Sequence, residues 1–288
     1  MTEICKSWLF VPADSERKLE KSRSSDADVV IYDLEDAVQP ARRDIARRLV
    51  ADVLQQDVPT VQCVRVNPVD SRDCADDLAA VMPYAPRWVM LPKLRSPACA
   101  DMLAEQLRAY DRKADDAEDA TAVVAIMTET PEMALRLPAL EALNPRVRAI
   151  TWGAEDLSVA IGATTTRGAD GEWLALYQQM RSQTLLAARA LNIQAIDTLY
   201  AAFKDSEGLA QYAQRAARDG FDGMLAIHPA QTTVINTAFT PDAESIREAQ
   251  RVVAAFAAQP DAGAVQLEGR MLDKPHLTLA QKILARAR

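Results

Sequence analysis

Short apolar runs alternate with longer amphipathic segments along almost the whole chain. Eight of these runs have the length and the β-branched and aromatic content of strands. Several, such as residues 29–32 (Val-Val-Ile-Tyr), are apolar without a break, which is typical of parallel strands covered on both faces. The predicted strands are residues 7–12, 28–34, 60–66, 87–92, 122–128, 147–153, 192–197 and 222–228.

The segments between these strands carry the start signals of helices. Asp14 and Ser15 precede the first one, and Thr130 places a capping residue before Pro131 in the first turn of another. Eight strand–helix units in order predict a (β/α)8 TIM barrel. An open doubly wound sheet is the alternative, because the order of elements alone does not prove closure. Residues 116–120 are predicted to form an acidic loop.

The chain continues beyond the last unit of the predicted barrel. We therefore expect two domains, a catalytic barrel of residues 1–258 and a C-terminal extension of residues 259–288. The extension contains Asp273 and His276, an acid and an imidazole. In barrel enzymes such an extension packs as a lid or reaches a neighbouring subunit, so we expect it to cap an active site.

Composition and charge exclude several classes of protein. The formal net charge of −8 argues against nucleic acid as a partner. No apolar run reaches the roughly 18 residues that a membrane span needs, and the first residues lack an apolar secretory region. The cysteines show neither a CxxC pair nor zinc-ligand spacing. We therefore expect a cytoplasmic protein that binds neither nucleic acid nor membranes.

Carboxylates gather where the predicted strands end, which is where TIM-barrel enzymes carry their chemistry. Acids that lie so close together need a positive charge among them, and a divalent cation is an economical source. Carboxylate and water ligands point to magnesium, or to manganese in its place. The polar residues at these ends are Asp33, Glu35, Asp36, Arg65, Asn67, Lys93, Glu129, Glu155, Asp156, Asp197 and His228.

Each of these residues also has a structural interpretation. Glu129 could favour the N-terminus of the helix that follows it, and Asp156 could be a helix cap. Arg65 could pair with a neighbouring acid, and Asp197 could orient loops. His228 is more typical of a structural residue than of a metal ligand, because no second histidine or cysteine accompanies it. The residues alone therefore leave the reaction open.

A series of short motifs nevertheless follows a fixed order along nearly the whole chain. The motifs are SWLFVP (7–12), DLEDAV (33–38), RVNP (65–68), LPK (91–93), TET (128–130), GAEDL (153–157), IHP (227–229) and MLDKPH (271–276). This series resembles the citrate lyase β-subunit-like proteins of the HpcH/HpaI aldolase group, of the malyl-CoA and citramalyl-CoA lyase type. The resemblance implies a TIM barrel, usually trimeric or hexameric, that acts as a magnesium-dependent carbon–carbon lyase on acyl thioesters.

The resemblance also implies roles for individual residues. Glu129 and Asp156 correspond to the acids that bind the metal, and Glu35 and Asp36 to acids that hold metal-bound waters. Arg65 corresponds to an arginine that contacts the substrate.

The tail acid has an implied role as well. Asp273 corresponds to an aspartate that completes a neighbouring subunit's site and handles the proton. This tail favours a homo-oligomeric lyase on free CoA esters over a subunit that depends on a carrier protein.

These residues are compatible with one cleavage mechanism. A metal that chelates the substrate's hydroxyl and carboxylate makes the alkoxide accessible, and its collapse gives an α-keto acid and the acetyl-CoA enolate. Arg65 would stabilise oxyanion charge, and backbone amides of the segment Gly153, Ala154 and Glu155 would bind the carboxylate. Asp273 would protonate the enolate carbon.

A CoA-binding enzyme with an acidic chain needs a local basic patch. Arg17, Lys18 and Lys21, which follow the first predicted strand, supply one. The alternative interpretation is an ordinary solvated helix face.

We therefore expect a lyase that cleaves a 3-hydroxy-3-carboxyacyl-CoA, such as citramalyl-CoA or malyl-CoA, to acetyl-CoA and an α-keto acid. The alternatives are the β subunit of a carrier-protein-dependent citrate lyase, a class II aldolase on free pyruvate, and a non-enzymatic assembly subunit. The sequence does not choose the substrate, because one methyl group changes discrimination by only about 1–3 kcal/mol.

Overall fold

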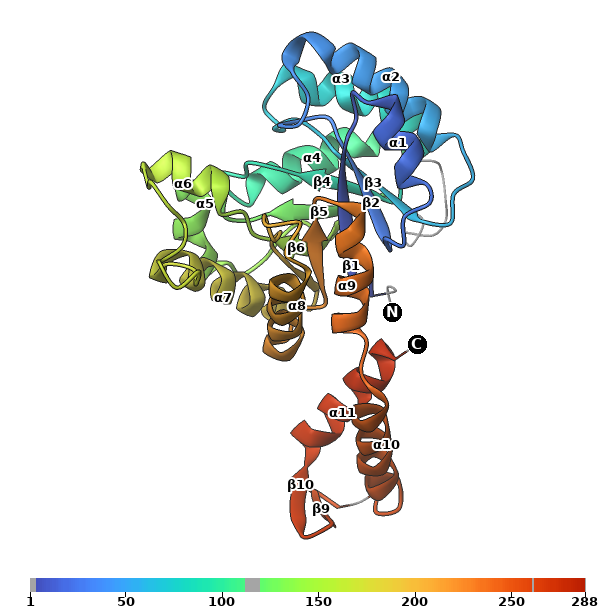
Figure 1. Ribbon diagram of the computed structural model, residues 1–288, viewed down its shortest axis with the longest axis vertical. Helices are drawn as coiled ribbons and strands as arrows, with labels where there is room; N and C mark the ends of the chain where they lie inside the picture. Colours follow the sequence, from blue (N-terminus) through green and yellow to red (C-terminus); the bar gives the residue numbers. More distant parts are fainter. Residues whose placement is uncertain (1–3, 112–119, 261, 288) are drawn as a thin grey trace. The chain divides into compact units, whose positions relative to one another are not determined.

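Eight parallel strands close into a barrel in the computed structural model of the chain (Figure 1). The structure describes residues 4–111, 120–260 and 262–287. Each strand pairs with the next, and the last pairs with the first, where Ser7 lies opposite Met224. The predicted TIM barrel is confirmed and the open sheet is excluded. The strands are β1 (Ser7–Pro12), β2 (Val29–Asp33), β3 (Val61–Arg65), β4 (Trp88–Leu91), β5 (Ala122–Ile126), β6 (Val147–Thr151), β7 (Gln194–Asp197) and β8 (Gly223–Ala226).

One face of the strands forms a continuous apolar core. Its residues alternate along each strand, as in Val29 and Ile31 of β2, because successive strand side chains point to opposite faces. The Trp8 and Trp88 rings meet edge to face with 5.3 Å between their centroids. Both rings are buried, so the interior is packed with side chains.

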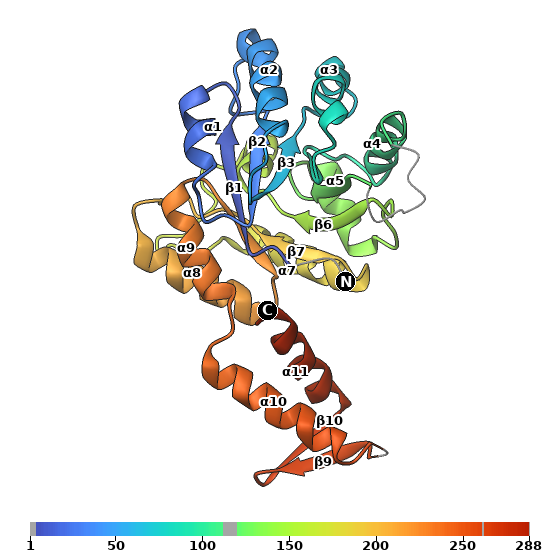
Figure 2. The same cartoon turned by 90° about the vertical axis from the view of Figure 1, so that its right-hand side faces the viewer.

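Helices flank the strands on the outside, as Figures 1 and 2 show. As predicted, Thr130 caps the helix after β5 by accepting from Met133 N at 3.2 Å, with Pro131 in its first position. Ser15 stands at the predicted cap of the first helix, although its side chain makes no capping bond. The predicted acidic loop at 116–120 lies, except for Ala120, outside the described residues. These helices are α1 (Glu16–Ser22), α2 (Arg43–Leu54), α3 (Arg72–Val81), α4 (Ala98–Arg108), α5 (Pro131–Arg136), α6 (Glu155–Ile161), α7 (Ala175–Ala190), α8 (Ser206–Asp219) and α9 (Pro229–Phe239), with short 3-10 turns η1 (Pro40–Arg42), η2 (Met82–Tyr84) and η3 (Leu137–Ala139).

Residues 1–235 form one compact unit, and residues 236–288 form a second one. Its helices α10 (Ala243–Ala257) and α11 (Lys274–Arg286) pack side by side, with the antiparallel hairpin β9 (Ala264–Leu267) and β10 (Arg270–Asp273) at one end of the pair (Figure 2).

The second unit has a small apolar core of its own. Val252 and Phe256 of α10 are buried in the same cluster as Val265, Leu272 and Ala280. Because α10 shares this core with α11, the packing favours a boundary before α10. The division between residues 258 and 259 stays a prediction.

The described residues contain no helix whose length and apolar content would let it cross a membrane.

Candidate active site

Arg65, the last residue of β3, is held rigidly at the rim where the strands end. Its Nε and Nη2 donate to the two carboxylate oxygens of Asp33, the last residue of β2, at 2.7 and 2.6 Å. Such a bidentate pair fixes the plane of the guanidinium as well as its position. Its Nη1 lies 3.2 Å from Glu35 Oε2, and the guanidinium stands over the Phe10 ring. Arg65 therefore pairs with neighbouring acids, as its structural interpretation predicted, and these pairs fix its guanidinium.

Lys93 is the cation that the sequence analysis left without a role. Its ammonium group bonds to Glu35, lies 2.8 Å from Asp36 and 3.5 Å from Asp156. Its backbone N–H donates to Glu129 Oε2 at 2.5 Å, from a residue with a left-handed φ of 52°. Its position two residues after β4 placed it among the strand-end residues, but the pattern of polar residues did not show which acids it contacts. Together with Arg65, Lys93 supplies positive charge that we had expected from a metal alone.

Burial and charge shift the acids of this cluster in opposite directions. Burial raises the pKa of Glu129 to about 8, against the opposing Lys93 N–H and Arg65. Burial also raises the pKa of Glu35 to about 7, opposed by Arg65 and Lys93. The pKa of Asp36 is lowered although burial acts against it, because the Lys93 ammonium beside it favours the carboxylate. Two of the acids therefore lie where a further positive charge would stabilise their ionised form.

Glu129 and Asp156 come from adjacent strand ends. Glu129 follows β5 and is buried, and Asp156 is the second residue of α6, close enough for its charge to raise the pKa of Glu129. The cap of α6 is Ala154, so Asp156 does not cap the helix. Gly153 lets the backbone before α6 lie close to the Glu129 side chain, since a Cβ on residue 153 would be only 3.0 Å from Glu129 Cγ.

The two acids fit a magnesium ion that keeps open positions. Among the described residues no group of three or more histidine, cysteine, aspartate or glutamate side chains is arranged to hold a metal. Magnesium is commonly bound by one or two carboxylates, with water and substrate oxygens as the remaining ligands. Glu35 Oε2 is buried and lies 3.2 Å from Arg65 Nη1, but it accepts no hydrogen bond from the described part of the chain, so it could accept one from a metal-bound water.

Two other residues of the predicted strand ends have structural environments. Asp197 is buried, accepts from Trp152 Nε1 at 2.7 Å and pairs with Arg181 at 2.7 Å. The His228 ring stacks on Phe203 with 5.2 Å between centroids, in agreement with its structural interpretation.

The basic patch lies on α1. Arg17, Lys18 and Lys21 are exposed, and the buried residues of this helix are Leu19 and Ser22. Exposure of this kind fits a CoA-binding surface and a solvated helix face equally.

Asp273 and His276 belong to the second unit, where they form a capping box at the start of α11. Asp273 N donates to His276 Nδ1 at 3.2 Å, and the side chains of both residues are about half exposed. The spacing of three residues thus has a local structural reason that the sequence analysis overlooked. The part of Asp273 in catalysis stays a prediction.

A TIM barrel whose rim combines paired carboxylates with a fixed arginine is typical of enzymes that use a divalent cation on substrates with oxyanions. Residues 6–229 match the family "HpcH/HpaI aldolase/citrate lyase". The chain belongs to this family of carbon–carbon lyases, as the resemblance had indicated.

The chain is similar over nearly its full length to characterised members. It is 38% identical to a citrate lyase subunit beta-like protein of Mycobacterium tuberculosis over 97% of this chain and 94% of the relative. It is 32% identical to the mitochondrial citramalyl-CoA lyase of Homo sapiens, over 97% and 84%. The structure of CitE from M. tuberculosis with magnesium, acetoacetate and coenzyme A superimposes with a TM-score of 0.79 at 35% identity, covering 99% of this chain and 98% of that one.

Proposed function

We propose that the protein is a CoA-ester lyase that cleaves a 3-hydroxy-3-carboxyacyl-CoA, of the citramalyl-CoA or malyl-CoA type, to acetyl-CoA and an α-keto acid. The observation that carries this proposal is the rim where Glu129 and Asp156 meet Arg65 and Lys93. The CitE complex supports it, since that relative holds magnesium, a keto acid and coenzyme A together.

Glu129 and Asp156 would hold the magnesium ion. When bound, the ion would lower the pKa of the substrate hydroxyl and so make the alkoxide accessible near neutral pH. Arg65, whose guanidinium is already fixed by Asp33, stabilises negative charge on the substrate oxygens without reorganising. The Lys93 ammonium group bonds to both Glu35 and Asp36 and holds these two acids at the edge of the site.

The substrate carboxylate would bind at the start of α6. The Gly153 N–H donates to Thr128 Oγ1 at 3.1 Å, so this amide already serves the link between the ends of β5 and β6. Of the three predicted residues, Ala154 and Glu155 are therefore favoured as the carboxylate-binding amides, because the first N–H groups of a helix lack partners within the helix.

Asp273 would move the proton at the carbon of the acetyl-CoA enolate. Its carboxylate is about half exposed and stands at the N-cap of α11, whose capping box fixes the place of the acid. The neighbouring Met271 is 79% exposed, so the hairpin presents an apolar side chain next to the acid. Both features suit a segment that docks on a neighbouring subunit, in a homotrimer or homohexamer.

The exposed face of α1, with Arg17, Lys18 and Lys21, would bind the phosphates of CoA. No disulfide joins the cysteines of the described residues, which fits the cytoplasmic compartment that we also predict.

The proposal is tested with purified protein and three thioesters: citramalyl-CoA, malyl-CoA and citryl-CoA. Each is incubated with magnesium or with chelator, and acetyl-CoA and the matching keto acid are quantified. Magnesium-dependent cleavage of one thioester is expected. Activity on a carrier-protein thioester alone would identify a citrate lyase β subunit, and aldol cleavage that releases free pyruvate without any thioester would identify a class II aldolase.

A further inference from the structure

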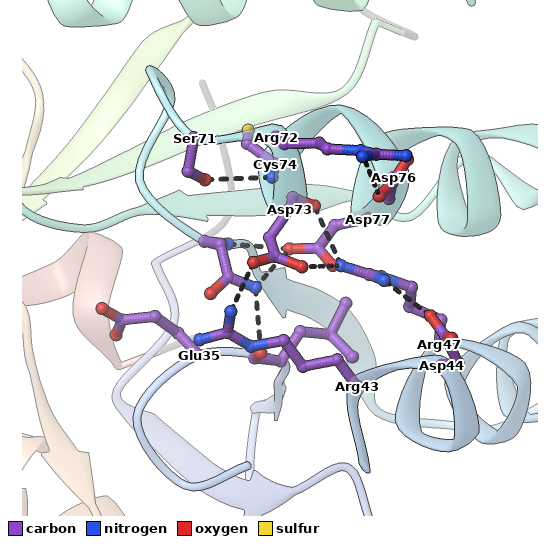
Figure 3. A network of polar contacts seen from close by, with 12 residues as sticks. Glu35, Arg43, Asp44, Arg47, Ser71, Arg72, Asp73, Cys74, Asp76 and Asp77 are labelled. Atoms are coloured by element: carbon purple, nitrogen blue, oxygen red, sulfur yellow. Dashed lines mark hydrogen bonds and ion pairs between the residues drawn. The ribbon is translucent and has the colours of Figure 1, made fainter. Parts of the chain in front are cut away.

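A network of charged side chains, buried at Arg47 and Asp77, connects α2 and α3 outside the site described above. Asp73 and Asp77 of α3 face the guanidinium groups of Arg43 and Arg47 of α2 (Figure 3). Arg47 is 8% exposed and lies 2.9 Å from Asp44, 2.7 Å from Asp73 and 2.7 Å from Asp77. Asp77 differs from the other two acids because it is completely buried.

Asp77 accepts three hydrogen bonds, two of which fix one asparagine. Its Oδ1 accepts from Arg47 Nε at 2.7 Å. Its Oδ2 accepts from both the backbone N and the side-chain Nδ2 of Asn67, each at 2.8 Å. A carboxylate has no donor, so it determines which end of the Asn67 amide faces it. The amide oxygen cannot take that position, and the orientation of Asn67 follows from the charge of Asp77.

The second hydrogen of the Asn67 amide reaches the rim. Asn67 Nδ2 donates to the carbonyl of Leu34 at 3.0 Å, and Leu34 N donates to the carbonyl of Arg65 at 3.0 Å. Leu34 lies between Asp33 and Glu35, whose carboxylates both contact the Arg65 guanidinium. A chain of hydrogen bonds thus runs from Asp77 through Asn67 to the segment that orients Arg65.

We infer that Asp77 is a positioning residue that acts through Asn67 to hold the segment after β2, so that Asp33 and Glu35 keep Arg65 in its reactive orientation. This inference rests on the proposed function, in which Arg65 stabilises the substrate oxyanion. Burial raises the pKa of Asp77, and Arg47 opposes this shift and holds the carboxylate in place. Asp73 pairs with both Arg43 and Arg47, whereas the Asp44 carboxylate is 91% exposed and water screens its ion pair with Arg47.

Two variants interrupt this series of hydrogen bonds, one at Asp77 and the other at Asn67. Asp77→Asn presents one acceptor oxygen and an NH2 group to three donors, so at least one donor faces another donor. Asn67→Ala removes the amide but leaves Asp77 paired with Arg47. We expect kcat to fall about 10- to 100-fold in each, with a smaller change in KM, because small misplacements of catalytic groups reduce the rate by such factors. Asp44→Asn is the matched control. It makes the same chemical change to a side chain that is 91% exposed, and wild-type kcat is expected.

Hydrogen–deuterium exchange of the full-length protein reports how firmly the segment of residues 34–38 is held. This measurement does not depend on enzymatic activity. The amides of Leu34, Glu35 and Ala37 are bonded to Arg65 O and to the Asp33 carboxylate. Residues 34–38 should exchange faster in Asp77→Asn and Asn67→Ala, and at the wild-type rate in Asp44→Asn.

Exchange that is unchanged at residues 34–38, or that increases uniformly over the barrel, would overturn the inference. So would a wild-type kcat in Asn67→Ala at a temperature where circular dichroism shows a folded protein. A wild-type protein that cleaves no CoA ester would instead refute the proposed function, and the exchange rates would still decide whether Asp77 positions the segment.

Discussion

The rim of the barrel and the C-terminal unit each present acids, but they hold them in different ways. At the rim, Glu35 is buried and paired with Lys93 and Arg65 from other strand ends. In the C-terminal unit, Asp273 is half exposed, and its carboxylate contacts the first turn of its own helix. The rim is therefore preorganised by the barrel itself, whereas the role proposed for the tail acid requires a docking event.

The largest expected effect concerns the rim. Glu129→Gln removes a carboxylate from the proposed metal site, and the loss of several kcal/mol of metal-assisted stabilisation corresponds to about a 1,000-fold lower kcat/KM. Calorimetric titration with manganese should show that metal binding is lost as well. Glu132→Gln, an exposed acid of α5, is the control and should behave as wild type. Manganese binding of wild-type strength in Glu129→Gln would contradict the metal assignment.

The tail should show a different combination of effects. Asp273→Asn is expected to lower kcat about 100-fold or more, the usual contribution of a positioned proton donor, while metal affinity stays unchanged. Stopped assays with the preferred thioester and a manganese titration test both parts. His276→Ala weakens the same capping box but keeps the acid, so it separates loss of the cap from loss of the proton donor. Near wild-type turnover in Asp273→Asn would remove the tail from the mechanism.

Lys93 allows a finer test of how positive charge at the rim affects metal binding. Lys93→Met removes a positive charge from the metal's surroundings, and a unit charge at about 4 Å is worth about 1 kcal/mol even in water. Metal affinity should therefore rise, by about tenfold, in a manganese titration. Lys93→Arg keeps the charge and should leave the affinity near the wild-type value. Weaker binding in Lys93→Met would mean that the lysine mainly positions Glu35 and Asp36.

The smallest effect is expected on α1. Reversing the charge of Arg17 and Lys18 to glutamate should raise KM for CoA esters a few-fold, about 1 kcal/mol for exposed charges, with kcat unchanged. Steady-state kinetics at two salt concentrations measure this, because screening should reduce the difference. Arg72→Glu reverses an exposed charge on α3 and serves as the control. Identical KM values would favour the solvated-face interpretation.

The barrel was readable from the sequence because its signal is local. Runs such as residues 29–32 are short, apolar and bounded by polar segments, and every predicted strand overlaps an observed one. The partners of the charged residues were not readable, since they depend on register between distant strands. The Lys93–Glu35 contact joins residues 58 positions apart, and a pattern of polar residues does not say which side chains meet.

Two further features show where interpretation of the local sequence pattern was incomplete. Asp77 looks like a member of a polar helix face, yet packing against Arg47 and Asn67 buries it completely. The Asp273–His276 pair could have been recognised as a capping box, because the spacing and the intervening Pro275 are typical of a helix start.

In the proposed function, the rim cleaves a carbon–carbon bond of a CoA ester with the help of magnesium. Product stoichiometry with the best thioester tests this, using protein freed of metal and then supplied with magnesium. Equal amounts of acetyl-CoA and keto acid are expected, formed only after magnesium is added. Free CoA and the intact hydroxy acid as the products would show thioester hydrolysis and refute the proposal, as would equal cleavage in the presence of chelator.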